Sequence, residues 1–364
     1  IFFFLLGLEI KREVLVGDLA QPENRRMLIL CALGGMICPA LIYSMFNYSL
    51  DSQIGWGIPM ATDTAFALGV LTIVRKHIPA SLLAFIVGLA IVDDVGAILV
   101  IAIFYTEQIS VMHLSSAFAL IAFLGLASYA GVRQPLFFIT ISILTWLMML
   151  KSGVHPTVAG VAIALTVPAR PGLASGKLLN KAKSIINSME KKPKSVDVLG
   201  SKEDHEKVLK VRDVAEEAST PLRRWEGALH LPVSLFILPL FALTNAGVIF
   251  SFSSLADSLQ HPIGLGIIFG LVLGKFIGIS GACWLALRYK LGSLPDKINF
   301  QHVVGASLIT GIGFTMSTFI AMLGFDGQPE QLQYAKTAIL IGSILAAMLG
   351  TIYLRVTSTK QNNE

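Results

Sequence analysis

Two adjacent carboxylates inside a long apolar run constrain this chain more than any other feature. Asp93 and Asp94 lie in residues 82–105, a segment that contains no other charged residue. An apolar run of more than about 18 residues is typical of a transmembrane helix. Each Asp near the middle of such a helix costs roughly 2.5–3.5 kcal/mol on insertion scales. This cost favours a functional role for the pair over a structural one.

The two carboxylates are expected to point in different directions, because neighbours on a helix lie about 100° apart. We expect one to contact a fixed partner and the other to face a cavity. Burial and the adjacent like charge both favour the protonated form of at least one carboxyl. A carboxyl that gains and loses a proton near neutral pH can exchange that proton for a cation. A structural polar cluster, or a helix end inside the run, is the alternative.

The composition is that of a polytopic membrane protein. Hydrophobic residues make up 54% and charged residues 14% of the 364 residues, and the mean hydropathy is +0.71. We predict these spans: residues 1–10, 27–46, 57–74, 79–105, 114–131, 135–150, 154–168, 229–250, 262–287, 301–325 and 333–354. The first residue is Ile1 rather than Met. We therefore expect a truncated N-terminus, with the chain starting inside a helix.

The distribution of Lys and Arg predicts the orientation of these spans. On one side of the membrane the only basic residues are Lys151 and Lys336, and nearly all the others fall on the opposite side. By the positive-inside rule, that opposite side and the C-terminus are cytoplasmic. The predicted parts are N-terminal transmembrane helices (1–168), a charged cytoplasmic loop (169–228), C-terminal transmembrane helices (229–356) and a cytoplasmic tail (357–364).

The three cysteines, Cys31, Cys38 and Cys283, lie in apolar segments without the spacing of metal ligands. We predict that they are small buried hydrophobic residues. We expect no cofactor.

Two apolar segments contain residues that interrupt a helix. In residues 57–74, Pro59 removes a backbone donor, and the side-chain oxygens of residues 62–64 compete for backbone hydrogen bonds. In residues 301–325, paired glycines around residue 312 can leave the helix at little cost. Irregular backbone at membrane depth is tolerated only where protein buries it or where it lines a cavity. We predict two broken helices, with Asp63 at the first break; Asp63 as the buried cap of an ordinary helix is the alternative.

Lys275 lies near the middle of the predicted span 262–287. Charges at this depth usually pair with one another. We predict an ion pair between Lys275 and one of the three intramembrane Asp residues. A lysine that extends to the membrane surface is the alternative.

Charged residues also gather at two predicted cytoplasmic helix ends. Glu9 and Glu13 share one helix face, with basic residues between them. Arg223, Glu226 and His230 lead into the apolar residues 231–248, and His titrates near neutral pH. Either cluster could sense protons or attract cations. A solvated helix end and a positive-inside anchor are the respective alternatives.

Five segments resemble motifs of the NhaA-type bacterial sodium/proton antiporters. They are residues 7–13, 61–70, 90–97, 151–155 and 311–317, and the resemblance runs from residue 1 to about 356 in order and spacing. It implies an all-α inner-membrane antiporter with inverted repeats and two broken, crossing transmembrane helices. Interrupted segments in both halves of a chain are typical of secondary transporters, of which this family is itself a standard example.

The resemblance also implies roles for individual residues. In that family, the residue that matches Asp94 binds Na+ or Li+ and exchanges it for protons. The residue that matches Asp93 forms an ion pair with the lysine that matches Lys275. Asp63 and Thr62 match family residues that lie where the two broken helices cross. There the charge of Asp63 would offset the positive dipole ends at helix N-termini, and the charge of Lys275 the negative dipole ends at helix C-termini. We expect oxygens of Thr62 or Asp63 to help Asp94 hold the ion.

The family match further implies regulation by pH. The matching cytoplasmic residues are Glu9, Glu13, Arg223, Glu226 and His230. Sodium would leave the cell in electrogenic exchange for protons, which would control intracellular pH and sodium. The expected partners are sodium or lithium ions, protons, membrane lipid and a second copy of the chain, without nucleic acid.

Three other functions remain open from the residues alone. A sodium-coupled symporter would need a pocket for an organic substrate, and a cation channel would conduct without obligatory exchange. A scaffold built on the loop of residues 171–224 would leave the intramembrane charges unexplained.

Overall fold

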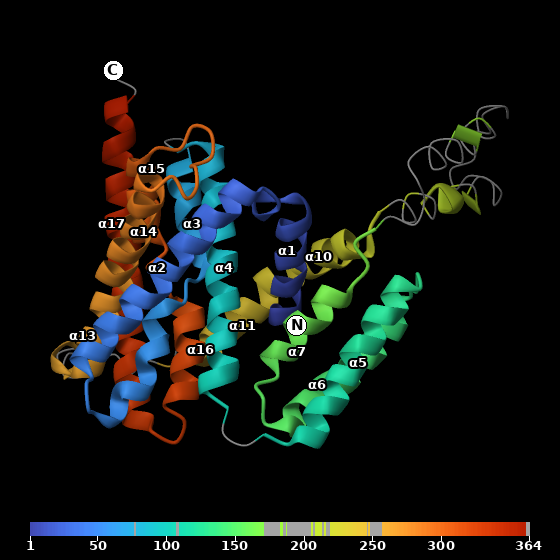
Figure 1. Ribbon diagram of the computed structural model, residues 1–364, viewed down its shortest axis with the longest axis horizontal. Helices are drawn as coiled ribbons and strands as arrows, with labels where there is room; N and C mark the ends of the chain where they lie inside the picture. The colour runs from blue at the N-terminus through green and yellow to red at the C-terminus, as the bar shows by residue number, and fades with distance from the viewer. Residues whose placement is uncertain are drawn as a thin grey trace.

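The computed structural model describes residues 1–75, 78–106, 109–170, 219–245 and 257–361, with Gly247 and isolated positions between 183 and 215. Every regular element within this part of the chain is a helix. Figure 1 shows α5, α6 and α7 on one side and the group around α2, α14 and α17 on the other, with α1 and α4 between them. Most of the predicted loop 169–228 and the end of the predicted tail lie outside the described residues.

The helices of the first half are α1 (Phe2–Val16), the 3-10 turn η1 (Asp18–Ala20), α2 (Pro22–Phe46), the 3-10 helix η2 (Asp51–Met60), α3 (Thr64–Val74), α4 (Ala80–Phe104), α5 (Val111–Tyr129), α6 (Pro135–Ser152) and α7 (Thr157–Thr166). Those of the second half are α10 (Pro221–Pro232), the π-helical turn η4 (Val233–Ile237), α11 (Leu238–Asn245), α13 (Pro262–Phe269), the π-helical turn η5 (Gly270–Gly274), α14 (Lys275–Arg288), α15 (Phe300–Ile309), α16 (Phe314–Gly324) and α17 (Pro329–Gln361).

Within the described residues, seven continuous helical stretches are long and apolar enough to cross a membrane, or up to nine if each bent pair is one span. The bent pairs are η2 with α3, at 43°, and α15 with α16, at 50°. The prediction of an all-α polytopic membrane protein with two broken spans is confirmed. The predicted span 154–168 is represented only by α7, which has 10 residues and is shorter than those seven.

Several helices extend beyond the predicted spans. Pro22, Pro221 and Pro329 each occupy a first helical position, before the apolar stretch begins. The ring fixes φ near the helical value, and the missing N–H is not needed there. The predicted start at residue 229 was therefore late, and the cluster from Arg223 to His230 lies inside α10. Hydropathy marks the apolar length of a helix, whereas caps and prolines set its ends.

Two glycines let α2 and α14 approach each other closely. A Cβ on Gly34 would collide with the carbonyl of Gly278, and a Cβ on Gly278 would collide with the carbonyl of Gly34. The backbones are therefore in direct contact at this point. This packing places α14, and Lys275 at its start, against α2 and the core.

Candidate ion-binding site

The first broken span places Asp63 between two helix ends. Asp63 has extended backbone and precedes α3, and its Oδ1 accepts a hydrogen bond from the Phe66 N–H at 3.1 Å. Its Oδ2 accepts from the N–H of Thr315 at 2.8 Å and from the Thr315 hydroxyl at 2.5 Å. One carboxylate thus caps both α3 and α16, whose N-terminal dipoles favour a negative charge. Asp63 is both a residue of the break and a buried cap.

Direct hydrogen bonds join the two broken spans where they meet. The Asp63 N–H donates to the carbonyl of Ile312 at 2.6 Å, and the Ser317 hydroxyl donates to the carbonyl of Ile58 at 2.7 Å. Backbone groups that leave the helical pattern at membrane depth are therefore satisfied by protein, as the low-dielectric surroundings require.

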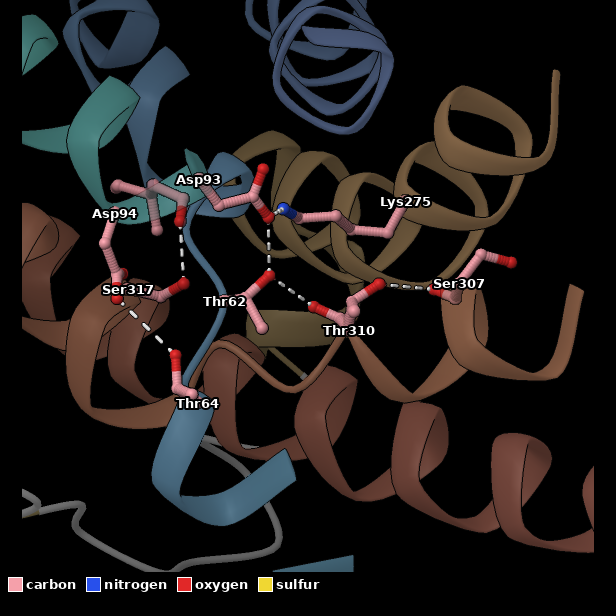
Figure 2. Close-up of polar contacts among 9 residues, drawn as sticks. Thr62, Thr64, Asp93, Asp94, Lys275, Ser307, Thr310 and Ser317 are labelled. Carbon is pink, nitrogen blue, oxygen red and sulfur yellow. Dashed lines mark hydrogen bonds and ion pairs between the residues drawn. The ribbon is translucent and has the colours of Figure 1, made fainter. Parts of the chain in front are cut away.

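Asp93 and Lys275 form a buried ion pair beside this crossing. Lys275 Nζ lies 2.5 Å from Asp93 Oδ2, and neither side chain is exposed. The Thr62 hydroxyl lies 2.8 Å from the same Oδ2 and 2.9 Å from the carbonyl of Thr310. Figure 2 shows Thr62 between Asp93 and Thr310, so the ion pair is connected to both breaks.

Asp94 points away from the ion pair. Its Oδ2 lies 3.4 Å from the Thr64 hydroxyl, and its buried Oδ1 has no hydrogen-bond partner among the described residues. Figure 2 shows the Asp94 side chain directed toward Thr64 rather than toward Lys275. The ion pairs found in the described part of the chain do not include Asp94. A buried polar atom without a partner is unusual. The Oδ1 of Asp93 is a second such atom, but the Oδ2 of Asp93 is paired with Lys275.

The structure distributes the hydroxyl groups differently from the sequence-based expectation. Thr62, expected to help Asp94, contacts Asp93 instead, and Thr64 is the threonine next to Asp94. Both oxygens of Asp63 are already used by the two helix ends. The extended backbone at the break decides which threonine faces which carboxylate. The hydropathy of the sequence does not predict this choice.

A cavity of about 230 Å³, which Thr315 helps to line, lies between α1, α11 and α16. It is lined mainly by apolar residues such as Phe241 and Phe319, and Asp94 is not among its lining residues. A cavity that faces Asp94 stays a prediction.

The predicted pH-sensing residues are divided between α1 and α10. Arg12, which the sequence did not single out, lies 3.0 Å from Glu13 and 2.8 Å from Glu226, so it links the two helices. The remaining members are Glu9, half-buried on α1, and Arg223 and His230, exposed on α10.

A family model described as Na+/H+ antiporter 1 matches residues 1–354, which include every residue of the crossing. The chain belongs to this antiporter family. Members of the family are secondary transporters rather than enzymes, and the chain is a multi-pass protein of the bacterial inner membrane.

Individual relatives carry names of the same kind. A Na(+)/H(+) antiporter NhaA 1 of Shewanella denitrificans is 73% identical over 360 residues, which are 99% of this chain and 80% of the relative. NhaA 2 of Psychromonas ingrahamii is 72% identical over 362 residues, with 99% and 76% covered. The Na(+)/H(+) antiporter NhaA of Sulfurimonas denitrificans is 44% identical over 364 residues, with 100% and 82% covered.

Proposed function

We propose that this protein exchanges Na+ or Li+ for protons across the membrane at Asp94. The observation that carries the proposal is the contrast between two neighbouring buried carboxylates. Lys275 lies 2.5 Å from Asp93, whereas the ion pairs of the described residues do not include Asp94; each of the two carboxylates has one oxygen, Oδ1, without a hydrogen-bond partner. An uncompensated charge at membrane depth is strongly unfavourable. Asp94 is therefore stable there only when it holds a proton or a metal cation.

Competition for this carboxylate would couple the two ions. Na+ prefers oxygen ligands, which the free Oδ1 of Asp94 and the Thr64 hydroxyl supply. The ion binds only after the proton leaves, and a returning proton displaces the ion. Each occupied state neutralises Asp94, so each permits the rearrangement that opens the site to the other side of the membrane.

Two charged residues would hold the crossing in place during this exchange. Asp63 offsets the N-terminal ends of α3 and α16 through its hydrogen bonds. Lys275 lies on the side of Thr310, where α15 ends, and would offset the C-terminal ends that meet there. In this proposal neither Asp63 nor Lys275 binds Na+ or Li+.

The proposal extends to charge movement and regulation. If protons bind Asp94 and also Asp93 or Lys275, more than one proton crosses for each Na+ and transport is electrogenic. An imposed K+ diffusion potential would then change the transport rate. The Arg12 contacts with Glu13 and Glu226 support a pH-sensitive link between α1 and α10 on the cytoplasmic side.

The positions of Lys and Arg support a cytoplasmic C-terminus. We also propose a homodimer in the lipid membrane. In the cell, the exchange would expel sodium and control intracellular pH.

The test is the collapse of an imposed pH gradient in proteoliposomes after addition of Na+ or Li+, at neutral and alkaline pH. We compare the unmodified chain with Asp94→Asn and with a matched control, Asp326→Asn, which changes an exposed carboxylate. The gradient should collapse in the unmodified chain and in the control but not in Asp94→Asn. Thermal unfolding in detergent checks that all three proteins are folded.

Other outcomes would contradict the proposal. A folded, unmodified chain that never responds to Na+ or Li+ would favour a symporter of an organic solute. Sodium flux without any proton counterflow would favour a channel.

A further inference from the structure

The hydroxyl of Thr62 has two acceptors but only one hydrogen. Its Oγ1 lies 2.8 Å from Asp93 Oδ2 and 2.9 Å from the carbonyl oxygen of Thr310. All three residues are fully buried, at 0% exposure. A threonine hydroxyl donates one hydrogen bond, although it can accept others. The carboxylate and the carbonyl therefore compete for the same hydrogen atom.

We propose that Thr62 couples the protonation of Asp93 to the backbone of the second broken span, which makes it a positioning residue for the exchange. When Asp93 is ionised, Thr62 donates to its Oδ2, because hydrogen bonds to charged acceptors are stronger than those to neutral ones. The carbonyl of Thr310 then loses this donor. When Oδ2 carries a proton, its O–H donates to Thr62 Oγ1, and the Thr62 hydrogen turns to the Thr310 carbonyl.

The carbonyl of Thr310 lies at a sensitive point of the backbone. α15 ends at Thr310, just before the 50° bend that leads into α16. The last carbonyls of a helix have no partner inside the helix, and an unpaired carbonyl at membrane depth is unfavourable. The hydrogen bond from Thr62 should therefore hold the break in its observed position. Loss of the proton from Asp93 should loosen the break.

The surroundings of Asp93 permit this uptake of a proton. Lys275 Nζ lies 2.5 Å from Oδ2, and the buried Oδ1 has no hydrogen-bond partner among the described residues. Oδ1 can therefore accept a hydrogen bond from Lys275 while the protonated Oδ2 donates to Thr62. One O–H bond forms on Asp93, the proton comes from the aqueous phase, and no electron is transferred. The charge of Lys275 is then offset by the helix C-terminal ends near Thr310.

This inference deepens the proposed exchange and rests on it, because Asp93 becomes a second proton carrier beside Asp94. A proton on Asp93 holds the break, and its release frees the break for the rearrangement that turns the site to the other side of the membrane.

Other titratable groups interact electrostatically with Asp93 or Asp94. They are Lys275 on α14, Asp63 at the first break, Glu9 on α1 and Cys31 on α2, together with the two aspartates themselves. The test therefore needs a variant that removes the titration of Asp93 alone from this group.

The test measures hydrogen–deuterium exchange of the purified full chain in detergent, without Na+ or Li+, from mildly acidic to alkaline pH. Exchange is corrected for the intrinsic effect of pH. It is followed in peptides that cover residues 300–318, and in peptides of α5 and α6 as a measure of general stability. Thr62→Val removes the hydroxyl, whereas Thr62→Ser retains it. The matched control is Thr145→Val, at a fully buried threonine on α6 whose hydroxyl donates to the carbonyl of Ile141.

In the unmodified chain, in Thr62→Ser and in Thr145→Val, residues 300–318 should exchange roughly two- to tenfold faster at alkaline than at acidic pH, the range that one hydrogen bond contributes. In Thr62→Val this response to pH should disappear. It should also disappear in the double variant Asp93→Asn with Lys275→Met, which removes the titrating carboxyl together with its cation. The peptides of α5 and α6 should show no such response in any chain.

Two results would overturn the proposal. One is an unmodified chain whose break does not respond to pH. The other is a folded Thr62→Val chain that keeps the full response, even if its break exchanges faster at every pH, because a purely structural role of the hydroxyl gives that result. If Thr62→Val does not fold, the double variant decides, and a full response there overturns the coupling. Asp94→Asn should keep the response, so loss of ion exchange and loss of this coupling are distinguishable.

Discussion

The two ion pairs Asp93–Lys275 and Arg12–Glu226 have the same chemistry in different surroundings. Both join elements that are far apart in the chain, at 2.5 Å and 2.8 Å. The side chains of the first pair are 0% exposed, whereas those of Arg12 and Glu226 are 34% and 17% exposed. Water and salt screen the second pair but cannot reach the first. The environment, rather than the distance, therefore decides how much stability is lost when one partner of each pair is removed.

Removal of the buried cation should have the largest effect on stability. Lys275→Met leaves Asp93 buried without its partner, which should cost roughly 3–5 kcal/mol at alkaline pH, where a proton does not easily replace the lysine. Thermal unfolding in detergent measures the loss. The double variant Asp93→Asn with Lys275→Met removes both charges and should recover most of it. Equal losses in the single and double variants would show that packing, not charge, stabilises this region.

Removal of the shared cap should have the next largest effect. Asp63→Ala removes the hydrogen bonds to the first turns of both α3 and α16. Each lost cap typically costs about 0.5–2 kcal/mol, so the combined loss should be about 1–4 kcal/mol. Thr315→Val, which removes only the hydroxyl hydrogen bond, should lose about 1 kcal/mol in the same measurement. If Asp63→Ala lost no more than Thr315→Val, the double cap would carry no additional stability.

The partly exposed pair, Arg12–Glu226, should contribute little to stability. Glu226→Gln removes the contact with Arg12 and should change the unfolding free energy by about 0–1 kcal/mol. A double-mutant cycle with Arg12→Gln, at low and high salt, isolates the pair, and its coupling energy should shrink as salt increases. A loss above about 2 kcal/mol that salt does not change would mean that this pair behaves like the buried one.

The smallest expected effect concerns His155, in the turn between α6 and α7. Its ring lies 5.3 Å from the ring of Phe319, and burial lowers the pKa of His155 below its ordinary value. The folded chain then binds fewer protons here than the unfolded chain. Its contribution to stability is therefore complete above about pH 6.5 and is lost as the pH falls below that value. His155→Gln should flatten the acid side of the stability profile; an unchanged profile would exclude this contribution.

The sequence by itself determined the class of the protein and the positions of its costly residues. Apolar length predicted the membrane helices, Pro59 and the glycines near residue 312 predicted the two breaks, and the depth of Lys275 predicted an ion pair. These features are local in the sequence. Each one places a polar or charged group at membrane depth, and few structures can offset the free energy that this costs. The family resemblance then indicated Asp93 as the partner of Lys275.

Only the tertiary structure decided which groups meet across the chain. It placed Thr62 on Asp93 and Thr64 beside Asp94, although the two threonines are two positions apart. It brought Asp63 to the N-terminal end of a second helix, α16. Each contact depends on the rotation and depth of one helix against another, which side-chain packing and close glycine contacts set. Hydropathy is nearly the same for every such register, so the linear pattern could not distinguish among them.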